Sequence, residues 1–148
     1  MINFRTFNDV QRALSDGSTT CLDITQSYLR SIDKHKYLNA FVEVYSSEAI
    51  KQSEVIDAKI KAGTAGKLAG MVIGIKDNLC YINHKVTAAS KVLEGFESLF
   101  SATSVDKLIH ADAIIIGRLN CDEFAMGSAN ENTIYGAVRN PVDNTKVS

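Results

Sequence analysis

The sequence predicts an α/β domain that contains a parallel β-α-β unit. Two short apolar runs next to glycines, at residues 70–76 and 113–117, are typical of strands covered on both faces. Capped helical patterns precede the first run and lie between the two. The chain has 148 residues with 45% hydrophobic content, which is enough for a real core in one domain.

The first 65 residues predict mainly helices that cover this core. Two helices are expected over residues 6–17 and 20–35, because each segment begins with a threonine and an acid three positions later. In that pattern the two side chains satisfy free backbone N–H groups at the helix start. Residues 40–45 alternate in the manner of a half-buried strand, and a third helix is expected from a serine cap near residue 46 to Gly63.

The second part of the chain predicts the β-α-β unit. A strand over residues 70–76 is followed by a long irregular segment, residues 77–100, with only a brief helical pattern near residues 90–94. A capped helix over residues 103–110 then leads into the second apolar strand. Strand, helix and strand in this order favour parallel pairing, so both carboxyl ends lie at one edge of the sheet. Ligands of open α/β sheets bind at that edge.

Lys76 is the first candidate for chemistry, because it ends the strand at this edge. A buried ammonium must be paired, neutralised or led out to water. The residues alone leave two interpretations open: a functional lysine, or a lysine that reaches water and pairs with Asp77. A neutral lysine could activate a serine, and a lysine could also form a Schiff base or bind phosphate. Residues 121–126 predict a short helix after the second strand. Its Asp122 and Glu123 could form an acid/base or metal pair, but adjacent residues on a helix diverge, which favours one carboxylate at the site and one exposed.

Composition excludes several classes of protein. Sixteen basic against seventeen acidic residues give a formal net charge of −1, which argues against a nucleic-acid or membrane-surface module. No apolar run is long enough to span a bilayer. Three widely spaced cysteines are expected to be free thiols in a reducing, cytoplasmic compartment. The histidines and cysteines do not cluster as zinc ligands do, so no metal site is expected.

Four motifs resemble those of the amidase signature family, in the family's order. They are G-I-K-D-N at 74–78, T-A-A-S at 87–90, G-R-L-N-x-D-E-F-A-M-G-S at 117–128 and E-N-x-x-Y-G-x-x-x-N-P at 131–141. The likeness covers nearly all of the chain, and the last two motifs look most like the A subunits of glutamyl-tRNA(Gln) amidotransferases. It implies the N-terminal part of the amidase signature fold, a mixed β-sheet flanked by helices. Residues 1–65 would be helical covering and 66–148 the start of the catalytic core, cut before a Gly/Ser-rich segment.

The resemblance also implies site residues. Lys76 matches the lysine of a Ser–cis-Ser–Lys triad, whose two serines are expected beyond Ser148, so this chain alone is expected to be inactive. Three positions match the substrate pocket: Met126, Gly127 and Ser128. Lys85 and Glu123 match positions that could line the polar passage through which the family moves ammonia.

The implied function is that of a glutaminase subunit. It would release ammonia from glutamine, and partner subunits B and C would use ATP and Mg²⁺ to convert Glu-tRNA(Gln) to Gln-tRNA(Gln). This chain itself would then need no cofactor and no membrane. One alternative is a stand-alone amidase of the same family. An alternative of another class is a non-catalytic interaction domain whose sheet edge is vestigial.

Overall fold

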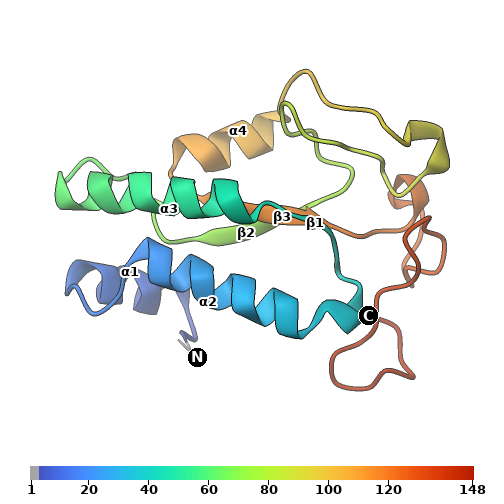
Figure 1. Ribbon diagram of the computed structural model, residues 1–148, viewed down its shortest axis with the longest axis horizontal. Coiled ribbons are helices and arrows are strands. Elements are labelled where there is room, and N and C mark those ends of the chain that lie inside the picture. The colour runs from blue at the N-terminus through green and yellow to red at the C-terminus, as the bar shows by residue number, and fades with distance from the viewer. Residues whose placement is uncertain (1–3) are drawn as a thin grey trace. The chain divides into compact units, whose positions relative to one another are not determined.

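The computed structural model describes residues 4–148, which form two compact units. The first unit contains the residues up to Lys34, together with Tyr45–Ile73 and Lys107–Ile116. The second unit contains His35–Val44, Gly74–Asp106 and Gly117–Ser148. Figure 1 follows the elements along the chain, from the blue N-terminal helices to the red C-terminal loops.

Three helices dominate the first unit: α1 (Phe7–Ser15), α2 (Cys21–Lys34) and α3 (Ser46–Lys61). The predicted capping box of α1 is confirmed, since Thr6 Oγ1 accepts from Asp9 N at 3.2 Å and Asp9 Oδ2 accepts from Thr6 N at 3.0 Å. The same exchange, between Thr20 and Asp23, starts α2. The serine cap predicted for α3 is wrong, because Tyr45 stands at the cap position and makes no side-chain cap bond. Helices α2 and α3 pack against each other (Figure 1).

Two buried polar residues of the first unit, Ser53 and Asp112, are hydrogen-bonded to other groups. Ser53 Oγ donates to Ala49 O at 2.6 Å. Asp112 accepts from Lys59 Nζ and from Gly66 N, both at 2.6 Å. Burial raises the pKa of Asp112, but the hydrogen bonds from these two partners and the charge of Lys59 outweigh burial, so the pKa lies below its ordinary value.

The sheet has three strands, β1 (Phe41–Val44), β2 (Val72–Lys76) and β3 (Ile114–Leu119), in the order β1-β3-β2. Strands β1 and β3 are antiparallel. Strands β2 and β3 are parallel, because bonds from Ile114 N to Met71 O and from Asp77 N to Leu119 O advance along both strands in one direction. The predicted α/β class with a mixed sheet is confirmed, and α4 (Thr103–His110) lies between the parallel strands in the chain.

Strand β2 differs from the prediction. Only Ile75 is buried, whereas the three residues before it are half-buried and Lys76 is exposed. The reason is position: β2 ends the strand order and has β3 as its one neighbour among the described residues. Strand β3, with a neighbour on each side, is buried except at Leu119.

The second unit is largely irregular. Its regular turns are three short 3₁₀ helices, η1 (Lys36–Leu38), η2 (Lys91–Leu93) and η3 (Glu123–Ala125). The helix predicted over 121–126 is therefore wrong beyond one turn. The physical reason is that Phe124 and Ala125 have φ of 51° and 59°, in the left-handed region, where a right-handed helix cannot continue.

Candidate active site

A depression of about 280 Å³ lies in the second unit, at the carboxyl ends of β2 and β3. Its lining includes residues from three segments that carry sequence-predicted positions or directly follow a strand. Lys76 ends β2, Asn120 to Asp122 follow β3, and Gly127 and Ser128 come from the loop beyond. This is the edge at which the order of strands in the sequence predicted a site.

Lys76 is exposed at this depression. Its neighbour Asp77 is 0% exposed and pairs with Arg118. Successive strand residues point to opposite faces, which separates the two side chains at the strand end. The ion pair between Lys76 and Asp77, one of the two interpretations left open by the sequence, is thus replaced by one between Asp77 and Arg118.

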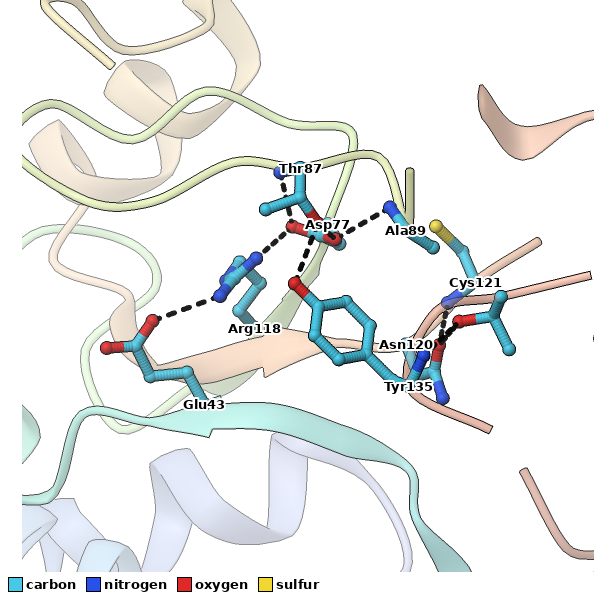
Figure 2. A network of polar contacts seen from close by, with 9 residues as sticks. Glu43, Asp77, Thr87, Ala89, Arg118, Asn120, Cys121 and Tyr135 are labelled. Carbon is cyan, nitrogen blue, oxygen red and sulfur yellow. Dashed lines mark hydrogen bonds and ion pairs between the residues drawn. The ribbon is translucent and has the colours of Figure 1, made fainter. Parts of the chain in front are cut away.

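The carboxylate of Asp77 is the centre of a buried polar network (Figure 2). Its Oδ1 accepts from Thr87 N at 3.0 Å and from Arg118, and its Oδ2 accepts from Thr87 Oγ1 at 2.6 Å and Ala89 N at 2.9 Å. Thr87 Oγ1 also lies 2.8 Å from Tyr135 Oη. Sequence reasoning missed this network, although an arginine directly after the second apolar run was a signal for it.

Arg118 is buried, with its side chain 4% exposed, and it is paired on two sides. One nitrogen donates to Asp77 and another donates to Glu43 Oε2 at 3.2 Å (Figure 2). Burial lowers the pKa of Arg118, but the hydrogen bond and the charge of Asp77 outweigh burial, so the pKa lies above its ordinary value. Arg118 therefore stays charged inside the second unit.

The loop that lines the depression is folded around Asp122. Its carboxylate, in a residue 7% exposed, accepts from Asn130 N at 2.9 Å and Asn132 N at 3.2 Å. Gly127 lies so close that an added Cβ would stand 2.7 Å from each carboxylate oxygen. Asp122 faces the depression and Glu123 is exposed, which confirms the expected divergence of this pair.

The other sequence-predicted positions are spread over the second unit. Ser128 lines the depression together with Gly127, whereas Met126 is 85% exposed and does not line it. Lys85 is exposed and its backbone forms an isolated bridge with Glu97. Glu123 is also exposed and accepts from Ser90 Oγ at 2.6 Å. Neither Lys85 nor Glu123 lines the depression, and their part in an ammonia passage stays a prediction.

The side chain of Asn120 makes hydrogen bonds to the segment that follows β3 (Figure 2). Its Oδ1 accepts from Thr133 Oγ1 at 2.8 Å and from Cys121 N at 2.9 Å, and its Nδ2 donates to Gly136 O at 2.8 Å. Burial, and then the charge of Asp77, raise the pKa of the Cys121 thiol. A nucleophilic role for that thiol is disfavoured, because the thiolate is the reactive form.

Metal and membrane sites do not emerge from the described part of the chain. Residues 4–148 contain no group of three or more His, Cys, Asp or Glu side chains that could hold a metal ion. Among the same residues, none of the helices has the length and apolar character needed to cross a bilayer. The three cysteines are unpaired.

Comparison with known proteins shows which proteins the chain is similar to. The sequence model of the Amidase family matches residues 23–148. The A subunit of the glutamyl-tRNA(Gln) amidotransferase of Chlorobium phaeobacteroides is 42% identical over 147 residues, which is 99% of this chain and 31% of that protein. The chain thus spans about a third of the length of this curated relative.

Solved structures agree with the sequence comparison. The peptide amidase from Stenotrophomonas maltophilia has a TM-score of 0.83 and 27% identity, over 93% of this chain and 30% of that one. The A subunit of the Thermotoga maritima glutamyl-tRNA(Gln) amidotransferase has a TM-score of 0.66 and 30% identity, over 86% of this chain and 27% of that one. The chain belongs to the amidase signature family.

Proposed function

We propose that the chain supplies the N-terminal third of a glutaminase subunit, with Lys76 as its catalytic base. One observation carries the proposal: Lys76, in the family's G-I-K-D-N motif, stands at the same depression as Gly127 and Ser128. The choice of glutamine as the amide is supported by relatives about 40% identical, which are named as A subunits of glutamyl-tRNA(Gln) amidotransferases.

In this proposal Lys76 acts as the uncharged amine at the start of the reaction. It accepts a proton from a bridging serine, which accepts the proton of a second serine as that serine attacks the amide carbon. The proton returns to the leaving nitrogen, and ammonia departs. Water then hydrolyses the acyl-serine to glutamate. In this proposal neither serine of the triad is assigned to residues 1–148.

The ammonia would be used by partner subunits B and C. With ATP and Mg²⁺ bound to one of these partners, they would convert Glu-tRNA(Gln) to Gln-tRNA(Gln) in the cytoplasm. The formal net charge of −1 agrees with a chain that leaves most tRNA contacts to its partners. Lys85 and Glu123 remain the proposed contributors to the ammonia passage.

A stand-alone amidase is the second candidate function. The observation that favours it is structural: the peptide amidase matches this fold with a TM-score of 0.83, against 0.66 for the Thermotoga amidotransferase chain. The same lysine and the same depression would serve both functions. The two functions differ in the amide that is hydrolysed and in whether partner subunits are bound.

The test uses the complete protein, co-expressed with the B and C subunits of the proposed complex. Ammonia release is measured with glutamine, with peptide amides and with aryl amides. We expect glutamine to be hydrolysed and the three subunits to co-purify. Hydrolysis of peptide or aryl amides but not of glutamine, by a protein that purifies alone, would replace the glutaminase with the stand-alone amidase.

A further inference from the structure

We propose that Asp77 is a positioning residue that fixes Lys76 relative to the wall of the depression, by which we mean the loop 122–128 that carries the lining residues Asp122, Gly127 and Ser128. The inference rests on the proposed function and deepens it, because the triad lysine and the substrate wall come from separate segments of the chain. Asp77 is the residue directly after Lys76. It is 0% exposed and therefore takes no part in contacts with solvent or substrate.

The first step of the argument is how firmly Asp77 is held. Its backbone N–H donates to Leu119 O at 2.9 Å, which extends the pairing of β2 with β3 by one residue. Its carboxylate takes four donors, two of them backbone N–H groups from Thr87 and Ala89. Its backbone carbonyl accepts from Ala88 N at 2.9 Å. One residue thus ties the end of the strand to three consecutive residues of the following loop.

The second step is the conformation of that loop. Ala88 and Ala89 have φ of 47° and 52°, a left-handed backbone that L side chains adopt rarely. Ala89 is 0% exposed. Two successive alanines persist in this conformation only where the surroundings determine it. The charged bonds from Thr87 N and Ala89 N to Asp77 are such surroundings.

The third step connects the loop to the wall. Ala88 O accepts from Phe124 N at 2.8 Å, and Ser90 Oγ donates to Glu123 Oε1 at 2.6 Å. Phe124 is itself left-handed, with φ of 51°. Residues 87–90 therefore set the turn from which Gly127 and Ser128 emerge. The path from Asp77 to the wall is continuous and runs through backbone bonds.

The charge of Asp77 is essential to this arrangement. An asparagine has the same shape but offers one acceptor oxygen and one NH₂ group. In either orientation of the amide the NH₂ faces a backbone N–H, that of Thr87 or that of Ala89. One donor of the loop then loses its acceptor inside the protein, which is costly.

The decisive variant is Asp77→Asn in the complete protein, with Asp112→Asn as its matched control. Asp112 is also a buried carboxylate that accepts from one cationic side chain and from a backbone N–H, and its partners Lys59 and Gly66 do not line the depression. We expect Asp77→Asn to lower kcat about 100-fold, the loss typical of a misplacement near 1 Å, while Asp112→Asn keeps kcat. Equal kcat in the two variants, at similar losses of unfolding temperature, would overturn the proposal.

A second pair of variants serves if Asp77→Asn does not fold. Thr87→Val removes the hydroxyl that donates to Asp77, at nearly unchanged shape, and Thr87→Ser retains it. We expect the valine variant to lose about 10-fold in kcat and the serine variant to recover it. A serine variant as slow as the valine variant would show that packing, and not the bond to Asp77, matters at this position.

Hydrogen exchange separates this proposal from the proposed function, since it needs no turnover. In Asp77→Asn, or in Thr87→Val, amides of residues 87–90 and 122–128 should exchange about tenfold faster or more, the loss expected from one charged hydrogen bond. Faster exchange in a protein that hydrolyses no amide would sustain the positioning role and refute the glutaminase. Unchanged exchange at residues 122–128 would refute the positioning role, whatever the activity.

Discussion

Gly127 offers a direct test of how the wall of the depression is built. A methyl group at this position would stand 2.7 Å from both carboxylate oxygens of Asp122. Such a contact requires the carboxylate or the loop to move, because the atoms met are a buried carboxylate with two backbone partners and not the end of a flexible side chain. Gly127→Ala should therefore displace the carboxylate from Asn130 N or Asn132 N.

The size of the effect follows from those bonds. A hydrogen bond to a charged group contributes about 1.5–3 kcal/mol, so the loss of one of the two gives a destabilisation of about 1.5–3 kcal/mol. For a chain of this length the same change lowers the unfolding temperature by about 3–12 °C. Glutamine hydrolysis by the complete protein should fall as well, because Gly127 lines the depression.

The assay is a double-mutant cycle read by thermal and urea unfolding. Asp122→Ala alone removes both bonds and leaves space for the methyl. In that background Gly127→Ala should cost less than about 0.5 kcal/mol, so the two substitutions are strongly non-additive. An equal cost of Gly127→Ala with and without the carboxylate would refute the contact as the reason for the glycine.

Three further predictions concern stability and reactivity. Asp112→Asn should lower the free energy of unfolding at neutral pH. Because the folded-state pKa of Asp112 lies below its ordinary value of 3.8, the difference in stability from wild type should shrink as the pH falls below that value. A difference that is unchanged at pH 2 would contradict this. A thiol reagent should modify half-buried Cys80 first, because burial raises the pKa of Cys121 and raises that of Cys21 to about 12; equal rates at all three thiols in the native protein would contradict this. Gly117→Ala should cost about 1–3 kcal/mol or more in urea unfolding, since its methyl would overlap the backbone of β1; an unchanged midpoint would contradict this.

Much of the fold was predictable because its signals are local. The threonine and acid at the start of α1 determine a cap within four residues, and the apolar run of β3 reflects neighbours on both sides. The edge position of β2 was not predictable, since an apolar run does not reveal how many strands flank it. The left-handed backbone of Phe124 was also not predictable from local signals. Its N–H donates to the carbonyl of Ala88, a residue that is distant in the sequence.

The candidate site was predictable in outline only. The order of strands brought Lys76 and the segment after β3 to one edge, as the depression confirms. The pairing of Asp77 with Arg118 was missed, because the sequence places Asp77 beside Lys76 and does not show which residue of the next strand lies opposite Asp77. Met126 was predicted at the pocket from its motif, yet the residue is 85% exposed and does not line the depression.

The most direct test of the central claim is glutamine turnover by Lys76→Ala in the complete protein, with Lys91→Ala as control. Both lysines are exposed residues of the second unit, and Lys76 alone of the two lines the depression. We expect Lys76→Ala to lose turnover while its unfolding temperature and its association with the partner subunits match those of Lys91→Ala. Turnover by Lys76→Ala equal to that of the control would contradict the assignment of Lys76 as the base and would favour a non-catalytic interaction domain.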